Sequence, residues 1–533
     1  MPSPLEKVSA ELTDEGKKKR IEKMAKKVKN KRRCGVLMPV FSLPSKYGIG
    51  TFSKEAYEFV DFLEKSGQSY WQILPLGPTS YGDSPYQSFS TFAGNPYFID
   101  LEKLIEMGFL KKDEVDKVNF GNSEEFVDYE RLFKARDLTL YTAYVNSGLS
   151  ENSKKKAKPA LKKEFETFVK KNADWLSDYA LYMALKKRYD GLSWNEWPED
   201  IRLRKKEALE TAREKYADRI GLYEFEQYIF MKQWFELKAY ANSKNIDIIG
   251  DIPIYVAFDS ADTWANPKLF QLDKKNLPIA VAGCPPDSFS RTGQLWGNPL
   301  YKWDYHEKTG FKWWIKRIKS CYELYDVVRI DHFRGFDEYY SIPFGEPTAE
   351  NGTWVKGPGY KLFDVMKKEL GNCRVIAEDL GYLTPSVIAL VKRTGFPGMK
   401  ILQFAFDARE ESDYLPHNYV QNSIVYTGTH DNDTTLGWFN TIPREDKRFA
   451  KKYLNIKSNK GVVWEFIRAT FASVSETAII PMQDYLELGS EARINIPSTL
   501  GKNWTWRMKN GVLTDELAEK MLDMAKTYGR SAL

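Results

Sequence analysis

Eight short apolar runs, separated by patterns typical of amphipathic helices, are the feature that most constrains the fold of this 533-residue chain. Such alternation indicates an α/β fold with a parallel sheet, and eight parallel strands are the number that a (β/α)8 TIM barrel requires. Helices are expected at Lys54–Lys65, Phe311–Tyr325, Tyr360–Leu370 and Pro385–Arg393. The predicted strands are Gly35–Phe41, Tyr70–Leu76, Ile246–Val256, Val327–Phe333, Arg374–Leu380, Met399–Phe406, Ser423–Thr429 and Thr477–Gln483.

Two long stretches depart from this simple alternation. The connection between the second and third predicted strands is far longer than one βα unit, and roughly residues 100–220 within it carry Lys, Glu and Leu at helical spacing. We expect a helical insertion subdomain there. A second stretch, about 258–310, is rich in Pro, Gly, Asn and Trp, which predicts an ordered loop insertion near the active-site face. The expected domains are a basic N-terminal extension, 1–33, and a catalytic barrel that carries both insertions, 34–533.

The positive charge of the chain is concentrated at its N-terminus. The formal net charge is +6 at pH 7, yet residues 1–33 contain 12 Lys and Arg against 5 Asp and Glu, and the other 500 residues contain 67 against 68. A basic segment of this kind can bind nucleic acid or an anionic polymer. The simpler interpretation is a solvated helix with Ile21, Met24, Ala25 and Val28 on one face. We expect no nucleic-acid binding, because the body of the protein has no basic excess.

Composition argues against a membrane protein and against a metal site. The mean hydropathy is −0.51, and no apolar run approaches the ~18 residues of a membrane span. The N-terminus lacks the apolar region of a secretory signal. There are only four histidines and no H-E-x-x-H motif, so neither a metal nor another cofactor is expected. We expect a cytoplasmic protein with reduced thiols, because its four cysteines lie far apart without C-x-x-C spacing: Cys34, Cys284, Cys321 and Cys373.

Three acidic residues stand where predicted buried strands end. Asp331 follows Val-Val-Arg-Ile, Glu378 follows Val-Ile-Ala, and Asp431 follows the run Ser423–Thr429 by two residues. In a barrel of parallel strands, the carboxyl ends of the strands form the active-site face. Carboxyl groups gathered there are the groups that glycoside chemistry uses. Any one of them alone is equally well explained as a strand-end carboxylate in an ion pair, whereas three on one face favour catalysis.

The spacing also suggests roles for these carboxyl groups. Asp331 is a candidate nucleophile, because Arg329 lies two residues earlier on the same side of the strand, where its charge would hold a neighbouring carboxylate ionised. Glu378 is a candidate acid/base. Its neighbour Asp379 must point the opposite way, so only one of the two can face the barrel mouth. A nearby like charge would help to keep Glu378 protonated.

Several unusual strings make the chain resemble a known family. They are Arg329–Gly335 (RIDHFRG), Ala377–Gly381 (AEDLG), Thr429–Asn432 (THDN), Gln72–Gln87 (QILPLGPTSYGDSPYQ) and Gly293–Tyr301 (GQLWGNPLY). They resemble the amylomaltases, which are 4-α-glucanotransferases also called disproportionating enzymes and are related to the α-amylases. The likeness extends from about Gly35 to about Met508.

This resemblance implies specific roles for residues of this chain. Asp331 would be the nucleophile, Glu378 the acid/base and Asp431 a stabiliser of the transition state. Gly283–Gly293 is similar to the mobile active-site loop of the family, although members often carry an aromatic residue where this chain has Ser288. Tyr81 resembles a residue of a secondary glucan site. The remaining residues implied to bind substrate are Arg329, His332, His430, Tyr86, Asp287, Phe289, Gln294, Trp296 and Asn298.

The function expected from this resemblance is transfer of α-1,4-glucan segments between maltooligosaccharides, or glucans derived from starch or glycogen, by a retaining double displacement. One alternative is an α-1,4-glucan hydrolase, which would use the same residues with water as acceptor. A second alternative is a non-catalytic glucan-binding protein, which would not need three carboxyl groups beside Arg329. For the aromatic Trp296, loop packing is the simpler reading when it is taken alone. The sequence makes no prediction about oligomeric state.

Overall fold

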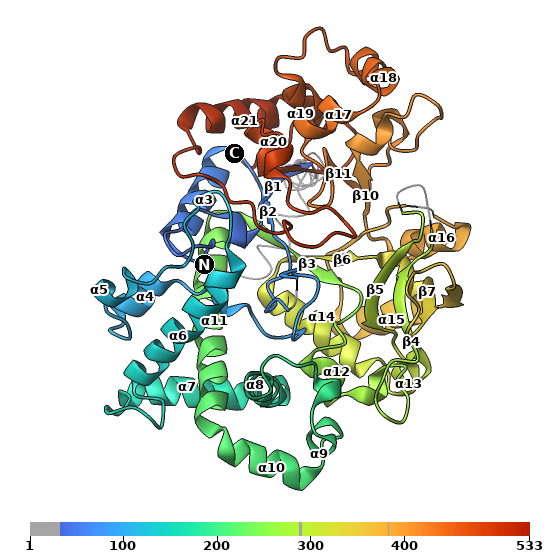
Figure 1. Ribbon diagram of the computed structural model, residues 1–533. Coiled ribbons are helices and arrows are strands. Elements are labelled where there is room, and N and C mark those ends of the chain that lie inside the picture. Colours follow the sequence, from blue (N-terminus) through green and yellow to red (C-terminus); the bar gives the residue numbers. More distant parts are fainter. Residues whose placement is uncertain (1–31, 81, 287–289, 382) are drawn as a thin grey trace, which may run out of the picture.

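Eight parallel strands form the centre of this computed structural model, which describes residues 32–80, 82–286, 290–381 and 383–533 (Figure 1). Their order is β10-β11-β12-β1-β2-β3-β6-β9. The backbone N–H of Ala377 donates to the carbonyl of Pro397 (2.9 Å), which joins the two outer strands and closes the barrel. The strands are Arg33–Leu37 (β1), Tyr70–Gln72 (β2), Asp247–Pro253 (β3), Val327–Asp331 (β6), Val375–Ala377 (β9), Gly398–Ile401 (β10), Ser423–Tyr426 (β11) and Thr477–Pro481 (β12).

The predicted (β/α)8 barrel is therefore confirmed, and each of the eight predicted runs overlaps one strand of it. The strands are shorter than predicted, mainly at their carboxyl ends. For example, the run predicted as Met399–Phe406 contains the end of strand β10 at Ile401. The residues that follow form a short 3-10 helix, Leu402–Ala405. The chain leaves the sheet at these points because the carboxyl ends of the strands turn into the loops of the active-site face.

Alternation along the strands decides which side chains reach the interior of the barrel. Val327 packs inside it, in a cluster with Ile249, Met399 and Tyr426. Val328 belongs instead to the large core between the strands and the surrounding helices. In β6 the inner positions continue from Val327 through residue 329 to residue 331, so this strand carries charge at its inner, carboxyl end.

Helices surround the barrel, and the four that the sequence predicted are present. The first, Lys54–Lys65 (α3), buries Phe59, Val60 and Leu63, which lie on one face at helical spacing. The others that accompany the strands are Lys312–Leu324 (α14), Tyr360–Leu370 (α15), Pro385–Thr394 (α16), Thr435–Thr441 (α17), Arg444–Leu454 (α18), Val462–Ala472 (α19), Met482–Tyr485 (α20) and Asp515–Thr527 (α21).

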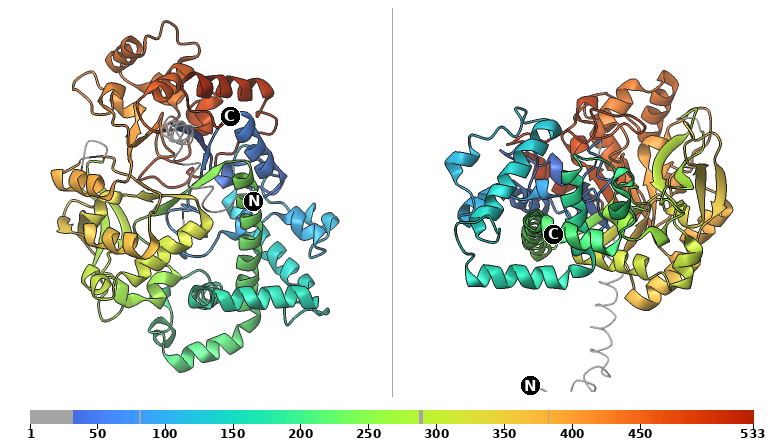
Figure 2. Two further views of the ribbon diagram at one scale, coloured as in Figure 1. Left: turned by 180° about the vertical axis from the view of Figure 1, so that it is seen from behind. Right: turned by 60° about the horizontal axis from the view of Figure 1, so that its bottom comes forward.

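Between β2 and β3 the chain is helical. The longest helix of the described residues, Ala217–Ser243 (α11), runs beside the barrel (Figures 1 and 2) and buries Phe230, Trp234 and Leu237. A second core, centred on Trp194 and Tyr182, lies outside the barrel. The other helices here are Leu101–Glu106 (α4), Lys112–Val115 (α5), Tyr129–Ser147 (α6), Pro159–Lys171 (α7), Ala173–Arg188 (α8), Glu199–Arg202 (α9) and Lys206–Lys215 (α10). Treating this part as a separate subdomain stays a prediction.

A small antiparallel sheet stands beside the barrel, where the sequence predicted loop. Two of its strands, Ala280–Cys284 (β4) and Gln294–Pro299 (β5), lie inside the stretch 258–310. They pair with Glu338–Pro343 (β7) and Thr353–Lys356 (β8) in the order β5-β4-β7-β8. The expectation of a loop was wrong for these strands because both are short and contain Gly, and because β4 pairs with β7, which lies far along the chain. Two short helices flank β4 and β5: Ala261–Ala265 (α12) and Trp303–Lys308 (α13).

The N-terminal end of the described chain belongs to the barrel. Strand β1 begins at Arg33, and the Arg32 guanidinium donates to the carbonyls of Phe471 (2.6 Å), Ser473 (2.8 Å) and Tyr528 (3.2 Å). The last two residues of the predicted extension 1–33 are thus part of the fold, and residues 1–31 lie outside the described residues. In the described ranges, no helix is long and apolar enough to cross a membrane.

Candidate active site

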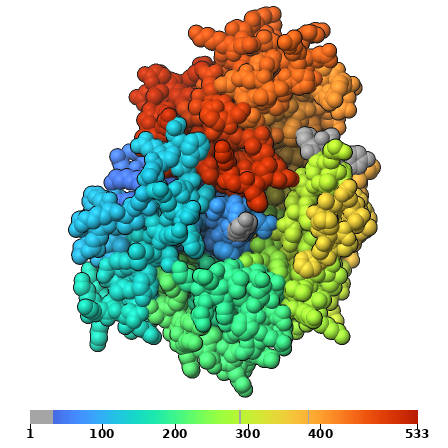
Figure 3. All heavy atoms as spheres, in the orientation of Figure 1, coloured from blue at the N-terminus to red at the C-terminus, as the bar shows by residue number. Residues whose placement is uncertain are grey.

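Three strand ends bring the predicted catalytic carboxyl groups to the mouth of the barrel. Asp331 is the last residue of β6, Glu378 directly follows β9, and Asp431 lies in the loop after β11. The face of the molecule in Figure 3 is hollowed near its centre, between the red C-terminal part and the yellow-green small sheet. The alternation of β6 turns Asp331 toward the inside of the barrel, as the sequence predicted.

A buried guanidinium connects Asp331 to a second carboxylate. Arg329 is 3% exposed, and its two terminal nitrogens lie 3.0 Å from Asp331 Oδ1 and 2.6 Å from Asp251 Oδ2. Asp251 is on β3 and is fully buried. The sequence reasoning missed Asp251, because it lies in the middle of the predicted strand Ile246–Val256 and apolar residues follow it, so no break into charge marks it.

Backbone groups hold the carboxyl group of Glu378. Its Oε2 accepts from the backbone N–H of His332 (2.7 Å), and its Oε1 accepts from the backbone N–H of Leu380 (2.8 Å). Asp379 points the other way and accepts from the backbone N–H of Met399 (2.7 Å), which agrees with the expected alternation. His332 has a left-handed backbone (φ 54°), a conformation that costs a non-glycine residue about 1 kcal/mol and is typical of functional sites.

Asp431 is held by its neighbour in sequence and by the C-terminal part of the chain. Its Oδ2 lies 3.5 Å from His430 Nε2, and its Oδ1 accepts from the Asn495 side-chain amide (2.6 Å). Arg493 donates to the backbone carbonyl of Asp431 (2.8 Å). The sequence reasoning missed Asn495, because nothing local marks a residue that reaches the site from a loop 64 positions further on.

Tyr86 joins the two halves of the site. Its hydroxyl donates to Asp251 Oδ2 (2.9 Å) and lies 2.9 Å from His430 Nε2, and its ring stacks on that of His430 (5.3 Å, 18°). Since the hydroxyl proton goes to the carboxylate, His430 Nε2 carries the proton that the tyrosine oxygen accepts. Contacts therefore run without a break from Asp331 through Arg329, Asp251, Tyr86 and His430 to Asp431.

Burial dominates the electrostatics of this network. It raises the pKa of both Asp331 and Glu378, against the lowering effect of Arg329 on each. The sequence reasoning counted the cation beside Asp331 but not the burial, so its expectation of a simply lowered pKa at Asp331 was wrong. Among the described residues, a cation lies within ion-pair distance of Asp331, and none does so for Glu378. This ion pair favours the charged form of Asp331, whereas burial favours the neutral form of both carboxyl groups.

The two histidines of the site are neutral near pH 7. Burial lowers the pKa of His332 to about 3, with a further contribution from Arg334, and burial likewise lowers the pKa of His430. Nε2 of His332 and Nδ1 of His430 are buried and have no hydrogen-bond partner in the described structure. Each of these nitrogens is therefore a buried polar atom whose hydrogen-bonding capacity the described contacts leave unused.

Aromatic and amide side chains from β5 complete one wall. The ring of Trp296 meets His332 edge to face (4.8 Å), and its indole N–H donates to the Gln294 side chain (3.1 Å). The amide of Asn298 donates to the carbonyl of Val256 (2.8 Å).

On the opposite side lies Trp504, which the sequence reasoning also missed. Its ring packs near Tyr86 (5.8 Å) and His430 (6.0 Å). Three predicted substrate-binding residues, Tyr81, Asp287 and Phe289, lie outside the described residues. No group of His, Cys, Asp and Glu within the described ranges is arranged to hold a metal ion.

Comparison with known proteins agrees with this geometry. The family model described as 4-alpha-glucanotransferase matches residues 38–514. The 4-alpha-glucanotransferase of Clostridium butyricum is 54% identical over 495 residues, which are 92% of this chain and 100% of that enzyme. The 4-alpha-glucanotransferase of Thermus thermophilus is 47% identical over 506 residues, 94% of this chain and 99% of that enzyme.

Solved structures show the same likeness. The amylomaltase from Streptococcus agalactiae in complex with acarbose matches with a TM-score of 0.90 and 44% identity, over 94% of this chain and 100% of that chain. The amylomaltase from Corynebacterium glutamicum, at 16% identity and a TM-score of 0.74 over 95% of this chain and 76% of that chain, shares the fold. The family resemblance inferred from the sequence is thus confirmed.

Proposed function

Because this chain belongs to the 4-alpha-glucanotransferase family and is a 4-α-glucanotransferase, we propose that it transfers α-1,4-glucan segments by a retaining double displacement at Asp331 and Glu378. The observation that carries the assignment is the network that joins Asp331, Arg329 and Asp251 at the barrel mouth. The other carboxyl group, that of Glu378, has no cation within ion-pair distance among the described residues.

In the first step Glu378 gives its proton to the glycosidic oxygen, and an oxygen of Asp331 bonds to C1 of the sugar as the C1–O bond breaks. The released glucan carries a new 4-hydroxyl, and the remaining segment is held as an ester of Asp331. Burial keeps Glu378 protonated, and the nearby Arg329 favours the charged form of Asp331 against the opposing effect of burial.

In the second step the 4-hydroxyl of an acceptor glucan attacks C1, and Glu378 takes its proton while the ester to Asp331 breaks. Two displacements at C1 restore the α configuration. Asp431, held by Asn495, accepts hydrogen bonds from sugar hydroxyls that strengthen in the transition state. The neutral ring of His332 places an unpartnered nitrogen at the same site.

Maltooligosaccharides and glucans derived from starch or glycogen are the proposed substrates. A relative of 44% identity, the amylomaltase from Streptococcus agalactiae, has been solved in complex with acarbose. The aromatic rings of Tyr86, Trp296 and Trp504 around the network offer apolar faces with polar edges, which suit glucose units. The predicted role of Tyr81 in a second glucan site remains a proposal, as do the roles of Asp287, Phe289, Gln294 and Asn298.

A cytoplasmic location, without nucleic-acid partners, remains part of the proposal. It is supported by cysteines that form no disulfide in the described residues and by the near-neutral charge of residues 34–533.

Incubation with maltotriose tests transfer against hydrolysis. We expect glucose together with a ladder of longer glucans, and a constant number of reducing ends. A rise in reducing ends in step with product, without longer chains, would show instead an α-glucan hydrolase.

A further inference from the structure

A groove of about 540 Å³ lies among the outer helices, and none of its residues belongs to the catalytic network. It runs between α7, α8, α11 and α14, and its volume is typical of sites for small molecules. The residues that the argument uses are Phe168, Trp175, Tyr228, Lys232, Phe235 and Lys316.

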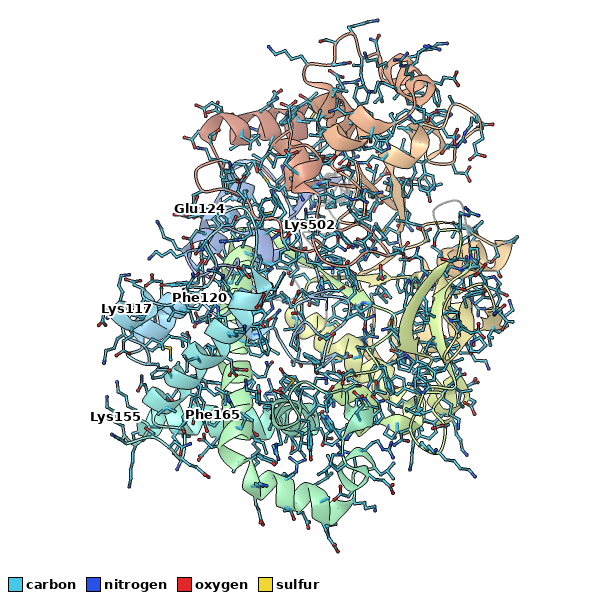
Figure 4. The ribbon with its side chains drawn as sticks, viewed as in Figure 1. Lys117, Phe120, Glu124, Lys155, Phe165 and Lys502 are labelled. Carbon is cyan, nitrogen blue, oxygen red and sulfur yellow. The ribbon has the colours of Figure 1, made fainter. Side chains whose placement is uncertain are left out.

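Aromatic rings form the floor and one edge of this groove. Trp175 stacks against Phe92 (6.3 Å, 27°), and Tyr228 meets Phe165 (5.9 Å) and Phe168 (5.7 Å) edge to face; Figure 4 shows Phe165 between α7 and α11. Phe235 remains 41% exposed, although Trp234 and Leu237 on the same helix are buried. An exposed ring at the edge of an aromatic groove is available to a ligand and contributes little to the core.

The polar rim of the groove is charged but nearly balanced, with the four lysines Lys171, Lys232, Lys316 and Lys319 against Glu164, Asp174 and Glu323. Lys232 pairs with Glu164 (2.7 Å), and Lys316 pairs with Asp174 (2.6 Å). These pairs offer donors and acceptors side by side without a strong field of one sign. An anionic ligand would approach Glu164 and Asp174 as closely as the lysines, and a wholly apolar ligand would leave the rim unpaired. A neutral molecule with many hydroxyl groups and apolar ring faces satisfies both the rim and the floor.

We propose that this groove is a further binding site for α-1,4-glucan chains, in addition to the catalytic network and to the second glucan site proposed for Tyr81. The proposal rests on the glucanotransferase activity only for the identity of the ligand, and not on which carboxyl group is the nucleophile. A long glucan held at the groove raises its own effective concentration at the barrel mouth, whereas a trisaccharide too short to be tethered gains nothing. Variants of the groove therefore affect long substrates selectively.

The test compares Phe235→Ala and Trp175→Ala with the unchanged protein, using amylose and maltotriose as substrates. We expect kcat/KM on amylose to fall three- to tenfold, and kcat/KM on maltotriose to stay within about 1.5-fold. Trp175→Phe, which keeps an aromatic face, should recover most of the loss. Phe133→Ala is the matched control, because Phe133 is 59% exposed on α6 and lies outside the groove.

Binding is measured directly by retardation in native gels that contain amylose, with Asp331→Asn in every chain so that the polymer is not consumed. We expect Phe235→Ala to reduce retardation and Phe133→Ala to leave it unchanged. Three results would each overturn the proposal. The first is unaltered retardation of Phe235→Ala, and the second is an equal loss of kcat/KM on maltotriose and on amylose. The third is preferential binding of a sugar phosphate at the groove. An Asp331→Asn chain that remained active would overturn the catalytic assignment alone.

Discussion

Two buried guanidinium groups lie at opposite ends of the barrel and have opposite surroundings. At the mouth, Arg329 contacts the carboxylates of Asp251 and Asp331. At the other end, where β1 and β12 begin, Arg530 is 0% exposed, and its guanidinium donates to backbone carbonyls. Those carbonyls belong to Arg33, Phe471, Ser473, Ser475 and Glu476.

The pKa values record this difference. Burial lowers the pKa of Arg530 to about 9, because carbonyl dipoles replace only part of the water that the cation loses. Burial acts in the same direction on Arg329, but Asp251 and Asp331 more than reverse it, so its pKa is raised. Arg530 stabilises the contacts between chain segments that are distant in sequence. Arg329 belongs to a group of charged side chains whose protonation states affect the reaction. Changes at the mouth should therefore affect chemistry, and changes at the base should affect stability.

Asp331→Asn should have the largest effect. The amide is nearly the same size but cannot form the ester, so we expect kcat on maltotriose to fall by several powers of ten with an unchanged melting temperature. Asp304→Asn, at an exposed position on α13, serves as the control. Retention of more than about a tenth of kcat would mean that Asp331 is an ordinary strand-end carboxylate.

Glu378→Gln should come next, with an effect that depends on the leaving group. Transfer from maltotriose should fall by about a hundredfold or more, since general acid catalysis is lost. Glucosyl fluoride leaves with little protonation and should still form the ester, which a burst of released fluoride would reveal. Equal losses on both donors would move the acid/base role to another carboxyl group, such as that of Asp431.

Arg530→Met tests the other end of the barrel. We expect the free energy of unfolding to fall by about 2–5 kcal/mol, because several buried carbonyls lose their donor. The kcat of the folded protein on maltotriose should stay within about twofold. Arg409→Met, where the side chain is 83% exposed, is the matched control. Loss of kcat without loss of stability in Arg530→Met would break the proposed division between the two ends.

Glu226→Gln tests a buried titratable side chain on α11, outside the strands of the barrel. Burial raises the pKa of Glu226 on α11 to about 8, from an ordinary value near 4.5. Between these values the unfolded chain has lost the proton and the folded chain keeps it, so stability falls as pH rises toward 8. The amide cannot ionise, so the variant should gain at least about 1 kcal/mol on the unchanged protein between pH 5 and pH 8. Parallel pH curves for both proteins, or the same gain in the exposed variant Glu214→Gln, would contradict this.

The fold was largely predictable because its strands are buried on both faces. Runs such as Val375–Ala377 are apolar throughout and are followed at once by charge, and that signal is local. The small sheet gave no such signal. Strand β4 pairs with β7, which is distant in sequence, Gly283 lies within β4, and Pro299 is the last residue of β5.

The site was predictable where a residue sits at a strand end, as Asp331 and Glu378 do. Asp251 was overlooked because it lies in the middle of a predicted strand, with apolar residues after it. Asn495 and Trp504 could not be found this way, because they reach the barrel mouth from a C-terminal loop through contacts distant in sequence. The pKa of Asp331 also required the structure, since burial is a property of the fold and not of the neighbouring residue.

The closure of the barrel has a consequence for how the enzyme fails on heating. In the part of the chain that the structure describes, the join between β9 and β10 is held by the Ala377–Pro397 backbone bond and by the bond from Met399 to the Asp379 side chain. Gly398 permits the latter, because a Cβ there would lie 2.3 Å from the Asp379 carboxylate. Glu378 stands between these two bonds along the chain. Thermal opening of this seam would displace the proton donor first, so inactivation should precede the loss of helical circular dichroism.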